Sequence, residues 1–241
     1  MALMLALARH VSQANATMRA GEWKRSTFIG VEMRGKTLGI IGLGRVGSEV
    51  ARRAAGFSMS LLGYDPFVSA DYAQHLGVEL ASLEELLRRS DFITVHTPIT
   101  DSTKGLIGAD ELRITKPGVR LINVARGGLV NEEALLQALE SGHVAGAALD
   151  VFDKEPPGES PLVQHPKVVT TPHLGASTEE AQQQVAREVV QEVIAILEGQ
   201  SAKSTVNLPF MPSDVQDVVA PYLEIATTLG KVATQLAEGQ F

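Results

Sequence analysis

The 241-residue sequence contains no cysteine at all. Disulfide bonds, thiol nucleophiles and thiolate metal ligands are therefore excluded for this chain. A chain without thiols is compatible with a reducing cytoplasm, which is the location that we expect. We also expect no metal site, because no other set of side chains in the sequence suggests one.

Positive charge is scarce as well, because 28 Asp and Glu residues outnumber 21 Lys and Arg residues and leave a net charge of −7. With no basic cluster to offset it, this balance argues against a nucleic-acid partner. No stretch reaches the roughly 18 apolar residues that a membrane span requires, so no membrane association is expected. The apolar residues 1–8 lack a positive segment before them and end at Arg9 and His10, so we do not expect them to be a signal peptide. We predict an amphipathic helix over residues 2–20 instead, closing at Gly21.

What the sequence does have is the composition of a folded α/β protein, with 44% hydrophobic and 20% charged residues. After Gly35, apolar strands alternate with helices, which predicts a parallel sheet covered on both faces. The predicted strands are residues 37–42, 60–64, 91–95, 119–124, 145–149 and 167–170. The predicted helices between them are residues 45–56, 82–89 and 131–140. Ser82 and Glu85 form a capping box, and Asn131 is a favourable N-cap.

A glycine turn joins the first predicted strand to the first of these helices. Gly42, Gly44 and Gly47 form the pattern G-x-G-x-x-G, in which the first glycine makes the tight turn and the second lets the backbone approach a pyrophosphate. The third lets helix and strand pack closely. The helix N-terminus offers unpaired N–H groups and a positive dipole end to that pyrophosphate. An incidental glycine turn is the alternative, but the flanking strand and helix favour a dinucleotide site. The fold class that we predict is a Rossmann-type doubly wound parallel sheet with helices on both faces.

The second predicted strand leads into Asp65, which follows Gly47 by 18 residues. A carboxylate at about this distance binds the ribose diol of the adenosine. Asp65 would repel a 2′-phosphate, and Pro66 and Phe67 supply no arginine to replace that contact. We therefore predict NAD rather than NADP as the cofactor.

Polar residues that could carry chemistry follow the other predicted strands. Ligands of parallel sheets bind beyond the carboxyl ends of the strands, so we expect residues 96–98, Arg126 and Asp150 at the site. Arg126 precedes two glycines, which leave room for a carboxylate in the guanidinium fork, although a surface arginine in a turn is the alternative. Taken singly, Glu155 would be a solvated loop carboxylate and His173 a structural histidine.

The C-terminal part follows the last predicted strand. Ser177 and Glu180 predict a capping box for a long helix that ends at Gly199. Residues 201–212 are polar and contain two prolines, so we predict a linker there. A final amphipathic helix is predicted over about residues 215–237.

Four segments carry a resemblance to a known family: residues 42–47, 124–128, 148–156 and 171–178. In their order and spacing over residues 1–200 they resemble the D-isomer-specific 2-hydroxyacid dehydrogenase family. Trp23, residues 64–66 and the tail from Val206 are most similar to its long-form subgroup. That subgroup oxidises 3-phospho-D-glycerate to 3-phosphohydroxypyruvate in L-serine biosynthesis. The resemblance implies an NAD-dependent oxidoreductase that transfers a hydride between C2 of a D-2-hydroxy acid and NAD.

The same resemblance assigns catalytic roles to three residues. His173 would be the acid–base at the substrate oxygen, Glu155 would hold its imidazole, and Arg126 would bind the substrate carboxylate and keto oxygen. The chemistry agrees, because imidazole titrates near neutral pH and a neighbouring carboxylate favours its charged form. A guanidinium can also polarise a carbonyl for reduction. Asp150 would face the nicotinamide carboxamide. The implied cofactor contacts are Gly42, Gly44, Arg45, Val46, Gly47, Tyr64, Asp65, Pro66, His96, Thr97, Pro98, Val124, Ala125, Arg126, Asp150, His173, Gly175 and Ala176.

The sequence departs from the family's pattern at both ends, so we expect a fragment. Residues 1–175 would be the NAD-binding domain, and residues 176–205 the return helix of a mostly missing substrate-binding domain. Residues 206–241 would be a linker and the first helix of a truncated C-terminal domain. With one wall of the cleft missing, we expect the chain to bind NAD with little turnover.

Two other functions stay open. One is another member of the family, such as a glyoxylate or hydroxypyruvate reductase. The other is a non-catalytic NAD(H)-sensing module similar to a corepressor, although such a sensor would not need Arg126, Glu155 and His173. The apolar first helix and Trp23 resemble the family's dimer contact, so we expect a homodimer or a higher homo-oligomer. For Trp23 itself, we favour a local packing plug over an anchor at a subunit interface.

Overall fold

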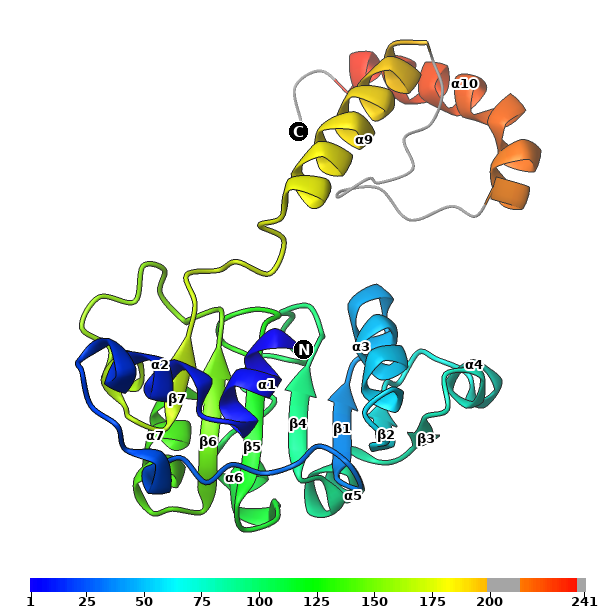
Figure 1. The fold of residues 1–241 in the computed structure, drawn as a ribbon. Helices are drawn as coiled ribbons and strands as arrows, with labels where there is room; N and C mark the ends of the chain where they lie inside the picture. The colour runs from blue at the N-terminus through cyan, green and yellow to red at the C-terminus, as the bar shows by residue number, and fades with distance from the viewer. Residues whose placement is uncertain (199–212, 238–241) are drawn as a thin grey trace. The chain divides into compact units, whose positions relative to one another are not determined.

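The computed structural model describes residues 1–198 and 213–237. The chain divides into two compact units, Met1–Ser177 and Thr178–Phe241 (Figure 1). The first unit is built on a parallel sheet of seven strands in the order β3-β2-β1-β4-β5-β6-β7. The strands are β1 Thr37–Ile41, β2 Ser60–Tyr64, β3 Glu79–Leu80, β4 Phe92–Val95, β5 Val119–Asn123, β6 Val144–Leu149 and β7 Val168–Thr170. The predicted Rossmann-type doubly wound sheet is therefore confirmed, and each of the six predicted strands is present to within one residue at either end.

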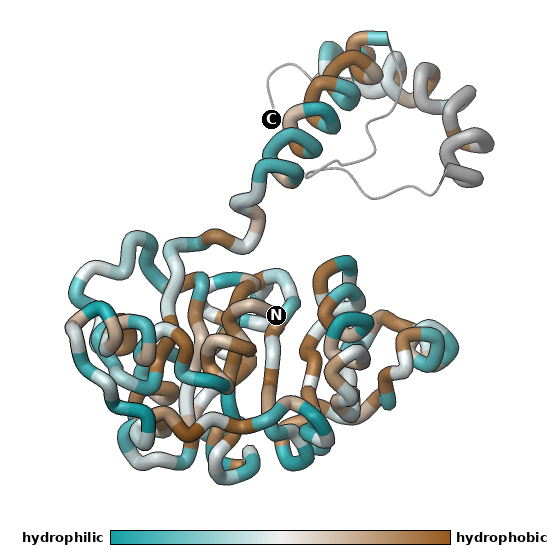
Figure 2. The backbone as a smooth tube through the Cα atoms, in the orientation of Figure 1, coloured by the Kyte–Doolittle hydropathy of each residue, from teal (hydrophilic) through white to brown (hydrophobic). Residues whose placement is uncertain are grey.

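Helices cover both faces of this sheet, and each face has its own apolar core. On one face α1 (Ala2–Ala8) and α3 (Arg45–Ala55) pack with Leu38 and Ile40 of β1. On the other, α5 (Leu83–Arg89), α6 (Ala109–Ile114) and α7 (Glu132–Glu140) pack with Ile41 of the same strand. Figure 2 shows the hydrophobic colouring concentrated along the strands between these layers. Because successive strand residues point to opposite faces, a strand buried on both sides must be apolar on both, as β1 is from Leu38 to Ile41.

The N-terminal helix differs from the prediction, because it is two helices rather than one over residues 2–20. The first, α1, ends at Ala8, and α2 (Val11–Arg19) begins after His10, which has a left-handed backbone with φ of 53°. The Val31 N–H donates to the Ala8 carbonyl at 2.9 Å, and a Cβ on Gly30 would lie 2.4 Å from the same oxygen. The returning chain therefore takes the carbonyl that a continuing helix would have used. This contact connects residues far apart in sequence, which is why helical periodicity did not reveal it.

The other predicted helices and caps are mostly confirmed. Ser82 and Glu85 form the capping box of α5, and the Asn131 side chain caps α7. The structure adds short elements that were not predicted: β3 and the helices η1 Arg25–Thr27, α4 Ala70–His75, α6 and α8 Pro161–Gln164. Each has at most six residues, too few for a clear periodic pattern.

The second unit contains α9 (Glu179–Leu197) and α10 (Ser213–Leu236). The final helix is present as predicted, but the N-cap of α9 is Thr178 rather than Ser177, because the Thr178 hydroxyl accepts the Ala181 N–H at 3.1 Å. The predicted helix end at Gly199 and the predicted linker over residues 201–212 lie outside the described residues.

Trp23 is not the packing plug that we favoured. Its side chain is 78% exposed, and it lines a surface hollow with Met18 and Phe28. A buried plug would have lost most of this exposure to neighbouring side chains.

Candidate functional site

The predicted nucleotide site lies where β1 and β4 are neighbours. From this pair the sheet grows outward in both directions, and ligands of such sheets bind beyond the carboxyl ends of the strands at this switch point. The His96 N–H donates to the Ile41 carbonyl at 2.7 Å, so the segments leaving the two strands stay in contact. A Cβ on Gly42 would lie only 2.8 Å from the His96 carbonyl oxygen. The backbone is therefore packed tightly at the base of the crevice.

The three glycines of the turn are required for three different reasons. Gly42 has a φ of +93°, which side chains disfavour. A Cβ on Gly47 would lie 1.9 Å from the Gly42 carbonyl oxygen, so helix α3 can approach the turn only without a side chain there. Gly44 has an ordinary φ of −66°, and a Cβ there would meet no atom within 4 Å. Nothing in the described residues explains a glycine at position 44, whereas a ligand lying against the backbone would explain it.

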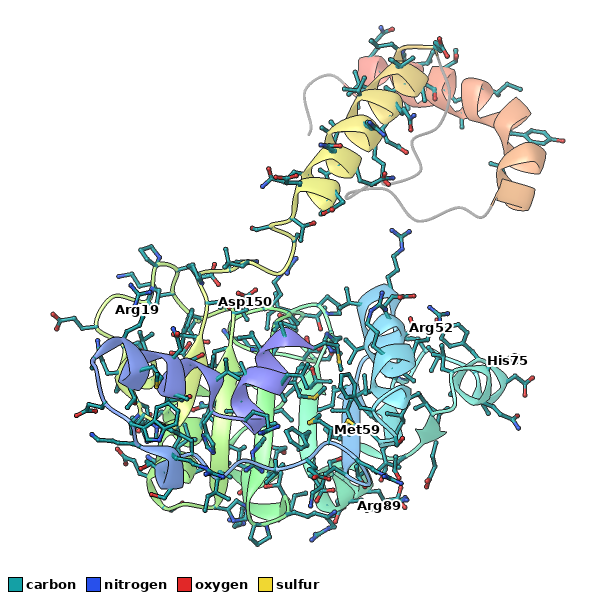
Figure 3. The ribbon with its side chains drawn as sticks, in the orientation of Figure 1. Arg19, Arg52, Met59, His75, Arg89 and Asp150 are labelled. Carbon is teal, nitrogen blue, oxygen red and sulfur yellow. The ribbon has the colours of Figure 1, made fainter. Side chains whose placement is uncertain are left out.

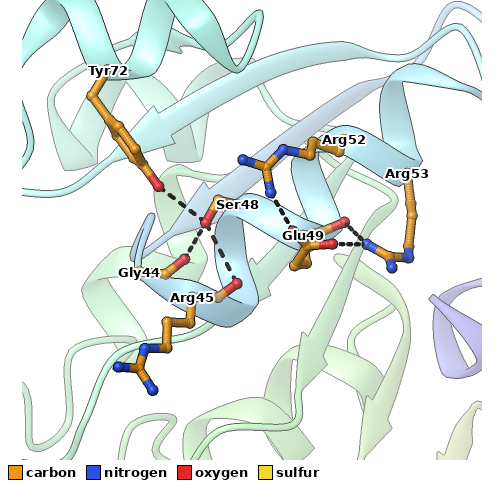
Figure 4. Close-up of polar contacts among 7 residues, drawn as sticks. All are labelled: Gly44, Arg45, Ser48, Glu49, Arg52, Arg53 and Tyr72. Atoms are coloured by element: carbon orange, nitrogen blue, oxygen red, sulfur yellow. Dashed lines mark hydrogen bonds and ion pairs between the residues drawn. The ribbon is translucent and has the colours of Figure 1, made fainter. Parts of the chain in front are cut away.

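The first turn of α3 offers positive groups to such a ligand (Figure 4). The buried Ser48 hydroxyl donates to the Gly44 carbonyl and accepts from the Tyr72 hydroxyl at 3.3 Å, which fixes the turn from behind. Glu49 pairs with two arginines further along the helix, whereas the Arg45 guanidinium makes no hydrogen bond or ion pair to a described residue. The Arg45 guanidinium and the open N–H groups of the helix can therefore bind an anion.

Asp65 holds the end of β2 against the glycine turn. Its Oδ2 accepts the Leu43 N–H at 2.8 Å, and its Oδ1 accepts the Phe67 N–H at 2.9 Å. Because each carboxylate oxygen has further acceptor capacity, Asp65 can also accept hydroxyl groups of a ribose.

His96 and Thr97 lie on the β4 side of the crevice. Burial lowers the pKa of His96 to about 4, so the ring is neutral at pH 7, with its Nε2 2.9 Å from the Thr94 hydroxyl. The Thr97 hydroxyl oxygen is buried and makes no hydrogen bond within the described residues. Buried polar atoms are rarely left without a partner, and a bound nucleotide could supply one. Gly44, Asp65 and Thr97 thus fit a dinucleotide.

The predicted acid–base residues come together at the carboxyl ends of β6 and β7. His173 Nδ1 lies 2.7 Å from Glu155 Oε2, with the side chains 51% and 37% exposed. This hydrogen bond holds the pKa of Glu155 below its usual range, with a smaller contribution from the charge of Arg126. An ionised Glu155 accepts a hydrogen bond from Nδ1–H. Nε2 is therefore the nitrogen left to exchange a proton with a ligand.

A buried carboxylate fixes the loop that carries His173. His173 has a left-handed backbone with φ of 56° and donates its N–H to the Asp150 carbonyl at 2.9 Å. The Asp150 side chain, only 1% exposed, accepts from the Thr171 hydroxyl and from the N–H groups of Leu174 and Gly175, the last two at 2.8 Å. Figure 3 labels Asp150 at the end of β6 that carries these loops. The predicted contact of Asp150 with a nicotinamide stays a prediction, since both of its oxygens already serve the His173 loop.

Asn123 is a residue that sequence reasoning missed. Buried at the end of β5, it accepts the Ala125 N–H at 3.1 Å and donates to the Arg126 carbonyl at 2.9 Å. It thereby shapes the turn that presents Arg126, whose exposed guanidinium donates to the Ala125 carbonyl at 2.6 Å. The available signal was an amide side chain at the end of a strand, directly after the apolar Leu121 and Ile122.

The remaining predicted contacts lie at the same edge of the sheet or in the first turn of α3, and their roles stay predictions: Val46, Tyr64, Pro66, Pro98, Val124, Ala125 and Ala176. In residues 1–198 and 213–237, no group of three or more His, Asp or Glu side chains is arranged to hold a metal ion. Within the same ranges no helix combines the length and apolar character needed to cross a membrane.

Comparisons with known proteins agree with this geometry. A family model described as "D-isomer specific 2-hydroxyacid dehydrogenase, NAD binding domain" matches residues 1–175. The chain is 50% identical over 234 residues to the D-3-phosphoglycerate dehydrogenase of Bacillus subtilis, covering 97% of this chain and 45% of that protein. It is 44% identical over 240 residues to the D-3-phosphoglycerate dehydrogenase of Methanocaldococcus jannaschii, covering 99% of this chain and 46% of that protein. The chain therefore spans less than half the length of these relatives.

Solved structures share the fold. A glyoxylate reductase from Paecilomyes thermophila superposes with a TM-score of 0.80 at 36% identity, over 85% of this chain and 62% of that one. A D-lactate dehydrogenase with NAD+ from Lactobacillus jensenii has a TM-score of 0.76 at 28% identity, over 86% of this chain and 66% of that one.

Proposed function

Because this chain belongs to the D-isomer-specific 2-hydroxyacid dehydrogenase family, we propose that it provides the NAD site and the acid–base pair for oxidising 3-phospho-D-glycerate to 3-phosphohydroxypyruvate. That reaction would place the protein in L-serine biosynthesis. The observation that carries the proposal is the 2.7 Å contact between His173 and Glu155 at the carboxyl edge of a sheet that also forms a dinucleotide crevice.

The residues divide the work as follows. Bound NAD would supply the acceptor for the hydride of C2 of the hydroxy acid. His173 takes the hydroxyl proton at Nε2, and Glu155 stabilises the imidazolium that results, since it already binds Nδ1. Arg126 has guanidinium N–H groups beyond the one used by the Ala125 carbonyl, and these bind the substrate carboxylate.

Cofactor binding uses the other half of the edge. The backbone at Gly44 leaves room for the pyrophosphate, and the open N–H groups of α3 would donate hydrogen bonds to it, with Arg45 beside it. Asp65 binds the adenosine ribose and disfavours a 2′-phosphate, which supports NAD over NADP. The Thr97 hydroxyl finds its missing partner on the nucleotide.

Substrate choice is supported by the relatives, since those named D-3-phosphoglycerate dehydrogenases share 44–50% of aligned residues. One alternative has an observation of its own, because the glyoxylate reductase structure superposes with a TM-score of 0.80. Reduction of glyoxylate or hydroxypyruvate uses the same His173, Glu155 and Arg126 in the reverse direction.

Turnover by the 241-residue chain is expected to be slow. The His173 side chain is half exposed and Arg126 is exposed, so water reaches the pair and competes for both groups. Exclusion of water and fixed positioning contribute several kcal/mol to catalysis in enzymes that achieve them.

A His173→Asn variant tests the proposal. We expect NADH to bind the wild-type chain and the variant with affinities within about twofold, because the variant keeps the residues proposed to bind the pyrophosphate and the ribose, Gly44, Arg45 and Asp65. Oxidation of 3-phospho-D-glycerate should fall by about 10²-fold or more in the variant. NADH fluorescence measures the first quantity and NADH absorbance the second, with the exposed His75→Asn as the matched control.

The outcomes separate the hypotheses. Absence of NADH binding to the wild-type chain would refute the cofactor site. A measurable wild-type rate that is unchanged in His173→Asn would remove His173 from the chemistry. A faster wild-type rate with glyoxylate or hydroxypyruvate than with the phosphorylated substrate would favour the reductase.

Association and location complete the proposal. Trp23 is 78% exposed beside the exposed Met18, which supports a homodimer formed through this surface. Sedimentation velocity of the chain tests the dimer. The absence of cysteine supports a cytoplasmic location, which fractionation of the producing cells would test.

A further inference from the structure

Asp153 links two loops that the proposed reaction needs in one arrangement. Its Oδ1 accepts the Gly128 N–H at 2.7 Å across 25 residues of sequence. Gly128 ends the Arg126 loop (residues 124–128), and Asp153 lies in the Glu155 loop (residues 150–157). One side chain therefore bonds the segment that carries the guanidinium to the segment that carries the carboxylate partner of His173.

A second carboxylate holds Asp153 itself. The Asp153 N–H donates to Glu132 Oε1 at 2.7 Å, and Glu132 is the first residue of α7. Burial raises the pKa of Glu132, partly offset by this hydrogen bond. Helix α7 follows the Arg126 loop in the chain, so Glu132, Asp153 and Gly128 form a closed connection between the two loops.

The two loops also touch through their backbones. A Cβ on Gly127 would lie 1.9 Å from the Phe152 carbonyl oxygen and 2.9 Å from the Asp153 nitrogen. Both contacts are with backbone atoms, so no side-chain movement could make room for a Cβ. The absence of a side chain at Gly127 is therefore what allows the two loops to approach. The Asp153 hydrogen bond then fixes the register of the two loops at the point where they meet.

This connection lies within two residues of Arg126 and of Glu155 along the chain. Arg126 immediately precedes Gly127, and Glu155 follows Asp153 by two residues. A 2-hydroxy acid carries its carboxylate and hydroxyl on adjacent carbons, so it needs the guanidinium and the imidazole at one fixed separation. We propose that Asp153, held by Glu132, is a positioning residue that sets Arg126 relative to the Glu155–His173 pair for this substrate class. The proposal rests on the proposed function for its substrate class. Its test does not depend on that function, because no substrate is used.

The test measures how strongly Arg126 acts on Glu155, whose pKa is lowered in part by the charge of Arg126. The midpoint of the Glu155 carboxyl titration, followed by NMR of the 241-residue chain, is compared before and after Arg126→Gln. Removing a nearby cation should raise this midpoint, since the cation favours the carboxylate. The comparison is made in three backgrounds: wild type, Asp153→Asn and Asp153→Ala. Asparagine keeps an oxygen that can accept the Gly128 N–H, whereas alanine removes it.

We expect the Arg126→Gln shift to be similar in wild type and Asp153→Asn and to fall to about half or less in Asp153→Ala, because coupling is lost when the loops separate. Equal shifts in all three backgrounds would overturn the proposal. Equal reductions of the Arg126→Gln shift in Asp153→Asn and Asp153→Ala would overturn it as well. The effect would then come from the charge of Asp153 rather than from its hydrogen bond.

Two controls distinguish a role of Asp153 in positioning from a general loss of folding and from the proposed function. Asp110→Ala removes an exposed carboxylate that pairs with Arg113 on α6 and should leave the coupling unchanged. NADH binding is measured on every variant and reports the integrity of the nucleotide crevice. A chain that fails to bind NADH but shows the expected loss of coupling would refute the proposed function while supporting the role of Asp153.

Discussion

The two halves of the candidate site are held by different means. The nucleotide half, at the ends of β1, β2 and β4, depends mainly on backbone geometry: the positive φ of Gly42 and the contact between Gly47 and the Gly42 carbonyl. The acid–base half, in the loops after β5, β6 and β7, depends on side chains: Asn123, Asp150 and Asp153. The contact between Gly42 and Gly47 joins near neighbours in the sequence, whereas these side chains join segments up to 25 residues apart. A side chain added at Gly42 or Gly47 should therefore disrupt the first half, and the loss of a hydrogen bond should disrupt the second.

The largest effect is expected from adding one methyl group to the nucleotide half. Gly47→Ala should destabilise the chain by about 4 kcal/mol, because its Cβ would lie 1.9 Å from the Gly42 oxygen and neither backbone can yield. The higher helix propensity of alanine returns only about 1 kcal/mol. Urea unfolding followed by circular dichroism measures the loss.

Gly44→Ala makes the same chemical change three residues earlier. Its Cβ has open space at an ordinary φ, so the unfolding free energy should change by less than about 1 kcal/mol. Affinity for NADH should nevertheless fall about tenfold or more, because a methyl group would stand between the backbone and the pyrophosphate. Wild-type NADH affinity in Gly44→Ala, or wild-type stability in Gly47→Ala, would contradict the division of roles among the glycines.

The acid–base half is tested by removing a hydrogen-bond acceptor from the Asp150 side chain while keeping the shape of that side chain. Asp150→Asn replaces a carboxylate oxygen by an NH₂ group that faces a backbone N–H or a hydroxyl in the His173 loop. We expect a loss of about 3 kcal/mol, because a buried donor is left unsatisfied and the remaining bonds lose their charge assistance. The exposed Asp110→Asn is the matched control and should cost less than about 0.5 kcal/mol. Equal unfolding free energies of the two variants would show that Asp150 does not hold the loop.

The same contrast explains what the sequence could and could not reveal. The strand–turn–helix around Gly42 was predictable because its periodicity and glycine spacing are local, and Asp65 follows at a fixed distance along the chain. Arg126, Glu155 and His173 were assigned by resemblance, and the residues that position them were not found, because Asn123 and Asp153 act across the fold. The break between α1 and α2 was missed for the same reason, since Val31 takes the Ala8 carbonyl from outside the helix. Trp23 was misjudged because exposure is a property of the folded surface.

The two histidines of the candidate site, His96 and His173, differ in burial. His96 in the nucleotide half has a pKa of about 4 because of burial, whereas its ordinary value is 6.5. Between these values the unfolded chain binds more protons than the folded chain, so stability rises with pH and is lost on acidification. From pH 7 to pH 5 the loss attributable to His96 is about 2 kcal/mol. The His173 side chain is half exposed beside Glu155.

Replacing His96 should therefore flatten the acid side of the stability profile. The unfolding free energy of His96→Gln should fall less between pH 7 and pH 5 than that of the wild-type chain, by the same amount of about 2 kcal/mol. The exposed His75→Gln should keep the wild-type profile, because that ring is solvated in both states. If wild type and His96→Gln instead run parallel between pH 7 and pH 5, the ring is not held neutral by burial. The crevice would then be open to water on its β4 side before any nucleotide binds.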